Sequence, residues 1–157
     1  ESIPAIQPVR NEDLYRMAGG WGWRLHPIYK VRKFHYGLDF SAPEGTEIFA
    51  TGDGVVVKSK RLYNGYGRHI VIRHGFGYET LYAHMSKSLV RKGDRVKRGQ
   101  VIGLVGSTGT STSSHLHYEV HKDGKKVNPS HYFFNDLTPE EYEAMLAATE
   151  LETQSLD

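Results

Sequence analysis

The 157-residue chain is long enough for one domain with a hydrophobic core. Its 24% of charged residues and net charge of +2 are ordinary for a globular protein, so composition gives no indication of a nucleic-acid partner. The absence of cysteine excludes a thiolate nucleophile, a cysteine-ligated zinc site and any disulfide.

The ends of the chain suggest how it is organised. No apolar run approaches the roughly 18 residues that cross a bilayer, and no signal peptide is recognisable. Because the chain begins at Glu1 rather than Met, we expect a processed or truncated fragment whose export signal or membrane anchor lay upstream. We expect residues 1–20 to be a lead-in segment, 21–134 to form the main domain, and 135–157 to be a helix and tail packed on it.

The first motif in chain order, HYGLD, places His35 and Asp39 four residues apart. A straight strand would separate their Cα atoms by roughly 13 Å, too far for both to bind one ion. Gly37 lies midway and can adopt backbone conformations that bend the chain. We therefore expect a bend at Gly37 that brings the two side chains together, with Leu38 and Phe40 anchoring the opposite face.

Short apolar runs bounded by Gly, Asp, Asn or Ser predict strands through the middle of the chain. The predicted strands are Glu47–Ala50, Val55–Ser59, His69–Arg73, Thr80–His84, Val101–Val105 and Leu116–His121. Gly75–Tyr78 reads as a tight connection, and Asp123-Gly124 between Val120 and Val127 is a strong hairpin signal. The sequence thus predicts a mainly β fold, a small antiparallel sandwich or open barrel.

A weak internal repeat relates residues 45–55 to residues 93–103. Each stretch has a Gly, an apolar residue three positions later, another Gly, and then a Val-rich strand. A duplicated β-hairpin would explain the pattern. The alternative is that turns between short strands simply look alike, and two copies do not decide between these explanations.

The second motif, HLHYEV, places His115 and His117 two residues apart. On a strand both would point to one face while Leu116 faces the core. A carboxylate and several imidazoles form a common ligand set for catalytic zinc, and His84, which ends the run YAH, offers one more imidazole. Glu119 and His121 continue along the same face, where either could orient a ligand. For His69, His74 and His131 no motif supports more than a surface or core role.

Near the C-terminus, Thr138-Pro139-Glu140-Glu141 has the pattern of a helix start. Thr138 would be the N-cap, Pro139 the first helical residue, and Glu141 the partner that completes a capping box. Leu137 and Tyr142 can form a hydrophobic staple, and Tyr142, Met145 and Leu146 share one helical face. We expect this helix to dock on the domain.

Taken together, these motifs resemble the LytM/lysostaphin-type zinc metallopeptidases, which cut peptide bridges in bacterial peptidoglycan. The resemblance extends from about Trp21 to Phe133 and rests on five segments in order: GWGWRLHP, HYGLDFSAPEGTEIFATGDGVV, YGRHIVIRHGFGYETLYAH, VKRGQVIGLVGSTGTSTSSHLHYEV and VNPSHYF. It implies a mostly antiparallel fold built on a duplicated hairpin. It also implies one Zn²⁺ per chain, a metal-activated water, and cross-links or stem peptides of peptidoglycan as substrates. The implied location is the cell envelope, periplasmic or extracellular.

The resemblance implies roles residue by residue. His35, Asp39 and His117 correspond to the three zinc ligands, and His84 and His115 to the two catalytic histidines. We expect His115 to act as general base and His84 to orient the water or stabilise the oxyanion, although these two roles could be exchanged or shared.

Several further residues are candidates for the substrate groove. Arg24 and His26 in the WRLHP run can shape it, or can form a structural turn set by Pro27. Tyr29 precedes His35 by six residues, where some relatives have a Tyr near the oxyanion. The remaining candidates are Asn64, Tyr66, Tyr82, Glu119 and the Ser/Thr-rich loop Ser107–Ser114, which we expect to form one groove wall. The alternative for Tyr66 and Tyr82 is that they simply pack.

Other classes of protein fit this sequence less completely. A catalytically silent regulator on the same scaffold would have damaged ligand positions, and none is damaged here. A phosphocarrier or a biotinyl-type carrier would not need Asp39. An enzyme held latent by an upstream segment is compatible with the sequence, as are regulators in the envelope.

The basic stretches Lys30–Lys33, Lys92–Arg98 and Lys122–Lys126 read as solvated faces or as contacts to an anionic polymer. The RLHP run favours direct cross-links by analogy.

Overall fold

In this computed structural model the chain is described over residues 3–11, 16–25, 30–133, 135 and 137–150. His26 and Tyr29 therefore lie outside the described residues. The strands are β1 (Met17–Gly19), β2 (Gly22–Leu25), β3 (Arg32–His35), β4 (Leu38–Ser41), β5 (Glu47–Phe49), β6 (Gly54–Arg61), β7 (Arg68–Arg73), β8 (Tyr78–Ala83), β9 (Met85–Ser88), β10 (Arg95–Val96), β11 (Val101–Val105), β12 (His115–Lys122) and β13 (Lys125–Val127). A 3-10 helix, η2 (Pro129–Tyr132), and one α-helix, α1 (Pro139–Glu150), follow.

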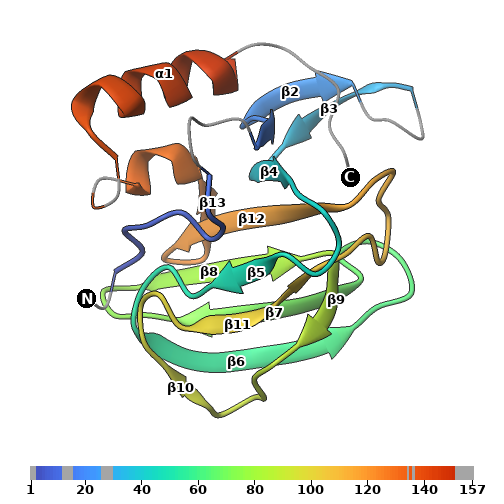
Figure 1. Cartoon of the computed structure of the whole chain (residues 1–157), viewed down its shortest axis with the longest axis vertical. Helices are drawn as coiled ribbons and strands as arrows, with labels where there is room; N and C mark the ends of the chain where they lie inside the picture. Colours follow the sequence, from blue (N-terminus) through green and yellow to red (C-terminus); the bar gives the residue numbers. More distant parts are fainter. Residues whose placement is uncertain (1–2, 12–15, 26–29, 134, 136, 151–157) are drawn as a thin grey trace.

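The strands form two antiparallel sheets and a separate ribbon (Figure 1). The large sheet has the order β1-β4-β12-β8-β7-β6-β10, with β13 paired to β12. The smaller sheet has the order β5-β11-β9, and the ribbon consists of β2 and β3. This architecture confirms the predicted mainly β, antiparallel fold with a short C-terminal helix.

The core lies on one face of the large sheet. Tyr118 pairs with Leu38 on one side and Tyr82 on the other, and Tyr82 pairs in turn with Ile70. All four side chains are fully buried and pack with residues such as Ile48 from the smaller sheet. Paired residues of an antiparallel sheet share a face, so the alternate residues of β12 and β4 point to the opposite face. The predicted burial of Leu38 and Phe40 is confirmed.

The two stretches of the internal repeat make matching hydrogen bonds, as expected of a duplicated hairpin. The Gly45 N–H donates to the Val105 carbonyl at 2.9 Å, and the Gly93 N–H donates to the Val56 carbonyl at 2.7 Å. In return, the N–H groups of Val105 and Val56 each donate, at 2.9 Å, to the residue after the glycine of the other copy. Thus β5 of the first copy pairs with β11 of the second, and β10 of the second pairs with β6 of the first.

Both described ends of the chain pack on this core. Ala5 and Val9 are buried, and the Ala5 N–H donates to the Thr51 carbonyl at 3.0 Å. At the other end the predicted capping box is present: the Glu141 N–H donates to Thr138 Oγ1 at 3.1 Å, and the Thr138 N–H donates to Glu141 Oε1 at 2.9 Å. Met145 of α1 is fully buried, as the predicted helical face requires.

The turns follow the predicted chemistry. Asp123 and Gly124 have φ values of 51° and 80°, the left-handed pair that a two-residue hairpin between β12 and β13 requires. Phe76 and Gly77 have φ values of 59° and 82° in the connection between β7 and β8. Within the described part of the chain, no helix is long and apolar enough to cross a membrane.

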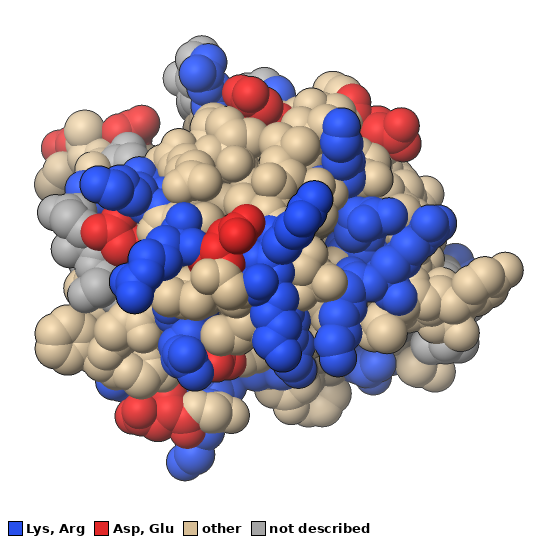
Figure 2. All heavy atoms as spheres, turned by 90° about the horizontal axis from the view of Figure 1, so that it is seen from below, with Lys and Arg blue, Asp and Glu red and all other residues tan. Residues whose placement is uncertain are grey.

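Exposed basic side chains gather on the face where β6 and β10 lie, which Figure 2 shows from below. Lys58 and Lys60 of β6 and Arg95 of β10 are all exposed. Most of the predicted basic stretch Lys92–Arg98 is exposed as well, as expected of a solvated face.

Candidate active site

Three side chains from the predicted motifs meet on the face of the large sheet opposite the core. His35 ends β3, Asp39 lies on β4, and His117 lies directly across from Asp39 on β12. Asp39 Oδ1 is 3.3 Å from His35 Nε2 and 3.0 Å from His117 Nδ1. One ligand atom from each residue lies within 4.8 Å of the others, so this trio could hold a metal ion.

The chain breaks between β3 and β4 at Gly37, as the HYGLD motif predicted, but the need for glycine has a different cause. Gly37 does not have a left-handed φ, so a special backbone conformation is not what it supplies. A Cβ at this position would lie 2.5 Å from the Tyr118 carbonyl oxygen and 2.8 Å from His117 Cε1. Glycine is required because β12 and the ring of His117 pass too close for any side chain.

The hydrogen bonds around the trio turn unshared electron pairs toward one another. His35 Nδ1 lies 2.8 Å from the Gly20 carbonyl oxygen, so it carries the proton and leaves Nε2 as an acceptor. His117 Nε2 lies 2.7 Å from Glu119 Oε2, which likewise leaves Nδ1 as an acceptor. Both acceptor nitrogens face the Asp39 carboxylate, and the three side chains are only 6%, 3% and 0% exposed. A buried cluster of acceptors needs a cation, and two imidazoles with one carboxylate are a ligand set that suits Zn²⁺.

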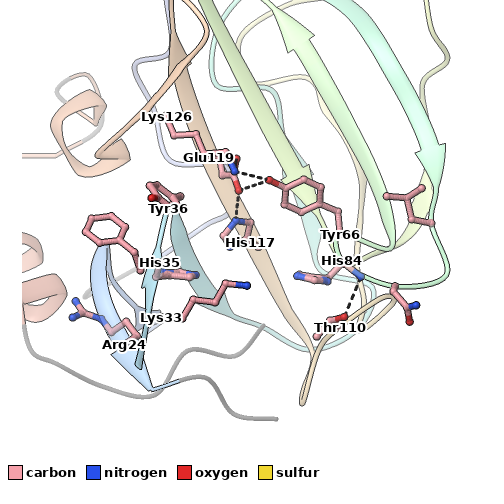
Figure 3. A pocket seen from close by; sticks show the side chains of 14 residues that line it. Arg24, Lys33, His35, Tyr36, Tyr66, His84, Thr110, His117, Glu119 and Lys126 are labelled. Atoms are coloured by element: carbon pink, nitrogen blue, oxygen red, sulfur yellow. Dashed lines mark hydrogen bonds and ion pairs between the residues drawn. The ribbon is translucent and has the colours of Figure 1, made fainter. Parts of the chain in front are cut away.

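Glu119 connects His117 to a wider network. Its Oε2 also accepts from the Tyr66 hydroxyl at 2.7 Å, its Oε1 lies 2.7 Å from His121 Nε2, and Lys126 Nζ lies 3.5 Å from Oε1. Burial by itself would raise the pKa of Glu119, but the hydrogen bonds from His117 and His121 outweigh it and hold that pKa far below its usual range. Glu119 is therefore ionised, and its charge orients the His117 ring (Figure 3).

Tyr66 and Lys126 support each other in this network. The Tyr66 ring stacks on that of His117 with centroids 6.0 Å apart, and Lys126 Nζ donates to the Tyr66 hydroxyl at 3.2 Å. Burial and the Glu119 charge raise the pKa of Tyr66, so its hydroxyl keeps its proton. Burial would lower the pKa of Lys126, but the Glu119 charge raises it, so Lys126 remains a cation.

His84 and His115 form a pair beside the trio, with ring centroids 4.7 Å apart. His84 Nδ1 lies 2.7 Å from the Thr108 carbonyl oxygen and His115 Nδ1 lies 2.9 Å from that of Ser113, so both protons sit on Nδ1. His115 Nε2 is 3.7 Å from Asp39 Oδ1. His84 directly follows β8 and has a φ of 62°, a strained conformation for a residue with a side chain, and strain of this kind is often found at functional sites.

Two loops are locked together at one wall of the site. Thr110 of the Ser107–Ser114 loop exchanges two hydrogen bonds with Gly65: its N–H donates to the Gly65 carbonyl at 2.9 Å, and its Oγ1 accepts from the Gly65 N–H at 3.0 Å. A Cβ on Gly109 would lie 2.4 Å from the Gly65 carbonyl oxygen, so the two backbones are in direct contact. Figure 3 shows His84 and Thr110 on one side of the pocket and Lys33 and His35 on the other.

The pocket between these walls has a volume of about 720 Å³. Its lining residues are Arg24, Lys33, Phe34, His35, Tyr36, Leu62, Asn64, Gly65, Tyr66, His84, Thr110, His117, Glu119 and Lys126. Of the predicted groove residues, Arg24, Asn64 and Tyr66 thus lie at the pocket. Tyr82 does not: it is fully buried on the core face, where its hydroxyl is 2.8 Å from Thr80 Oγ1. The alternation along β8 turns Tyr82 away from the site because its neighbour Ala83 pairs with His117.

Sequence reasoning named Glu119 as a residue that could orient a ligand, but it missed the groups that hold the other three histidines in place. These are the backbone carbonyls of Gly20, Thr108 and Ser113, which no residue type reveals. The position of Lys126 could have been predicted from the sequence. The predicted Asp123-Gly124 turn pairs Lys126 with His121, on the face that carries Glu119.

Residues 33–129 match the model of Peptidase family M23. The chain is 44% identical over 142 residues to the DD-carboxypeptidase/endopeptidase Mpg of Neisseria meningitidis, which covers 90% of this chain and 32% of that protein. It is 50% identical over 105 residues to the peptidoglycan DD-endopeptidase ShyA of Vibrio cholerae, which covers 67% of this chain and 24% of that protein. A zinc-containing peptidase from Vibrio cholerae has a similar structure, with a TM-score of 0.71 and 36% identity over 85% of this chain and 40% of that chain.

The chain spans less than a third of the length of these two relatives. The family model nevertheless spans the positions of the metal trio and of both paired histidines. The chain belongs to peptidase family M23, the LytM/lysostaphin type.

Proposed function

We propose that this chain is a zinc-dependent endopeptidase that hydrolyses peptide cross-links or stem peptides of bacterial peptidoglycan. The observation that carries the proposal is the convergence of His35, Asp39 and His117, with acceptor atoms facing one another, beside a pocket that also presents two further histidines. The similarity to the peptidoglycan DD-endopeptidase ShyA supports the substrate. A site of action in the cell envelope, periplasmic or extracellular, follows from that substrate.

His35, Asp39 and His117 would hold the ion. Three protein ligands leave a coordination position open, which is typical of catalytic rather than structural zinc. When bound, Zn²⁺ lowers the pKa of water toward ~7 and polarises a carbonyl group. Glu119 keeps the acceptor nitrogen of His117 aimed at the ion by holding the opposite ring nitrogen.

The paired histidines would move the protons. Because Ser113 fixes the proton of His115 on Nδ1, its Nε2 can accept a proton from the attacking water. The water oxygen then bonds to the scissile carbonyl carbon, the carbon–nitrogen bond breaks, and the same proton passes to the leaving amine. His84, fixed in the same way by Thr108, can donate from Nε2 to the oxyanion when its ring is protonated. The two histidines could also share these tasks.

Replacing single histidines separates metal binding from proton transfer. We expect His35→Ala to lose both zinc and activity, because it removes one of three ligands. We expect His84→Ala to keep about one zinc per chain and to lose roughly 10²–10⁴-fold in turnover. Metal analysis, together with hydrolysis of purified peptidoglycan before and after a chelator and mass analysis of the products, measures both. The exposed His131→Ala is the control and should behave as wild type.

Full activity of His84→Ala on native peptidoglycan would contradict the assignment of that residue. Zinc binding without cleavage by the wild-type chain would point to a latent enzyme or to a different substrate, whereas no zinc, even after the ion is added back, would point to the catalytically silent regulator that the sequence left as the alternative. That alternative is not favoured here, because no ligand position is altered.

A further inference from the structure

The pocket carries more positive than negative charge, and only one of its cations is uncommitted. Among the described residues that line it, the charged ones are Arg24, Lys33, Lys126 and one carboxylate, Glu119. Glu119 is fully engaged by His117, His121, Tyr66 and Lys126. The pocket therefore offers a positive potential that its own carboxylate does not neutralise.

The commitments of the other two cations leave Lys33 as the one that can bind a ligand. The Arg24 guanidinium is buried and donates to the carbonyls of Trp23 at 2.8 Å and Trp21 at 3.2 Å. Lys126 is held by Glu119 and Tyr66. Lys33 is exposed and, among the described residues, makes no hydrogen bond or ion pair, and its side chain extends into the pocket (Figure 3).

The pairing of the ribbon places a second positive charge beside Lys33. Arg24 on β2 and Lys33 on β3 are direct cross-strand partners. Like charges opposite each other in an antiparallel pair repel, so an anion that binds Lys33 from the pocket side would be favoured at this point of the ribbon.

The position of Lys33 relative to the metal trio defines where that anion would lie. Lys33 precedes His35 by two residues on β3, so both side chains leave the strand on the same face, about 7 Å apart along the chain. A carboxylate bound by Lys33 would thus lie beside the scissile bond rather than at a remote end of the substrate. In hydrolysis the scissile nitrogen leaves with one amino acid, and a free α-carboxylate on that amino acid is attached to the carbon next to this nitrogen.

We infer that Lys33 binds the free α-carboxylate of the leaving amino acid and so determines which peptide bonds are cut. This inference rests on the proposed function. It selects two kinds of substrate with the same local chemistry: a peptide whose last residue is removed, and a cross-link made to an amino acid through an amine whose neighbouring carboxylate is free. It disfavours a bridge within a continuous peptide, where the carboxyl group of the leaving residue is already an amide.

The test compares two synthetic peptides that differ only at the leaving residue, which carries either a free α-carboxylate or the corresponding carboxamide. For the zinc-loaded wild-type chain we expect kcat/KM to be about 10- to 100-fold higher for the carboxylate, the usual range for a hydrogen bond between charged groups. Lys33→Gln should lower kcat/KM for the carboxylate to the value for the carboxamide and leave the carboxamide value unchanged. Lys33→Arg should retain the preference. Lys87→Gln, which removes an exposed cation from β9 away from the pocket, is the matched control.

Failure of this inference and failure of the proposed peptidase function give different results. If the wild-type chain cleaves both peptides equally, or if Lys33→Gln slows both by the same factor, Lys33 does not select the carboxylate although the enzyme is a peptidase. If the wild-type chain with zinc cleaves neither these peptides nor peptidoglycan, the proposed function fails and the inference fails with it. Because Lys33 is exposed, an unchanged thermal midpoint in both variants will show that the fold is intact.

Discussion

Each histidine of the site has one ring nitrogen bound to an oxygen that faces away from the reaction space. For His35, His84 and His115 that oxygen is a backbone carbonyl, and for His117 it is the carboxylate of Glu119. These contacts decide which nitrogen carries the proton and which is available to a metal or a substrate. The chemistry of the site thus depends as much on the oxygens behind the rings as on the rings themselves.

Of these oxygens, only those of the Glu119 carboxylate belong to a side chain, so a mutation can remove them directly. We expect Glu119→Ala to weaken zinc binding by roughly 10- to 100-fold, because the His117 ring loses its orienting partner. Competition with a chromophoric chelator measures this affinity. Glu47→Ala, an exposed carboxylate on β5, is the control and should bind zinc as tightly as wild type. Unchanged affinity in Glu119→Ala would mean that the ring is held by its packing alone.

At this scale the sequence predicted which side chains come together and offered Glu119 as an orienting partner, but it did not predict the backbone carbonyls. His35, Asp39, His84, His115 and His117 come together as the motifs implied. The carbonyls behind three of the rings come from loops whose course depends on contacts distant in sequence, so no local pattern reveals them.

Among the elements, the close crossing of β12 over the β3–β4 break has the strongest effect on the site. The gap at Gly37 contains the Tyr118 carbonyl and the edge of the His117 ring, so this point of the chain fixes the distance between the ribbon and the large sheet. His35 comes from the ribbon, whereas Asp39 and His117 come from the sheet. Their separation therefore depends on how tightly the two parts pack at this glycine.

Replacement of this glycine tests that dependence. We expect Gly37→Ala to lower both the thermal midpoint and the zinc affinity, because the new methyl group must displace the His117 ring or the β12 backbone. Gly45→Ala is the comparison: its φ of 92° strains any side chain, but open space surrounds it. That variant should lose roughly 1 kcal/mol of stability and bind zinc normally. Normal zinc binding in Gly37→Ala would show that the site tolerates movement of the ribbon.

The strands that the sequence predicted are those with apolar runs between turn residues, such as β7, β11 and β12. Several strands that it missed have no such run: β3 is Arg-Lys-Phe-His, β9 is Met-Ser-Lys-Ser, and β10 has two residues. Their conformation comes from pairing with distant segments, which overrides weak local preference. The turns were easier to predict because their left-handed residues are chosen by local sterics.

At the scale of the whole molecule, a buried polar chain crosses the hydrophobic core. The Tyr118 and Tyr82 hydroxyls meet at Thr51 Oγ1, at 2.8 Å and 3.1 Å, and Tyr82 continues through Thr80 to His74 Nε2. His74 Nδ1 lies 2.7 Å from the Asp53 carbonyl oxygen, so it is the donor and Nε2 must accept from Thr80. Burial lowers the pKa of His74, which is neutral in this arrangement.

The sign of the resulting pH dependence follows from this lowered pKa. As pH falls below about 6.5, the unfolded chain takes up a proton at His74 while the folded chain does not, so stability decreases. The decrease stops once the pH is below the folded pKa. We expect His74→Gln to flatten the change in urea midpoint between pH 7.5 and pH 5.5, by at most about 1.4 kcal/mol per pH unit. His131→Gln should keep the wild-type slope, and an unaltered slope in His74→Gln would exclude this residue as the cause.

The exchange of strands between the two copies of the repeat has a consequence for how the chain folds. Neither copy contains a complete hydrogen-bonded pair, because β5 needs β11 and β10 needs β6. A nascent or truncated chain that ends before the second copy would present the edge of β6 without its partner, and unpaired edges invite association with other chains. The two copies pair with each other only after the strands between them, β6, β7, β8 and β9, have brought them together, so the contacts between the copies are distant in sequence. The duplication therefore yields a single cooperative unit rather than two modules that could form one after the other.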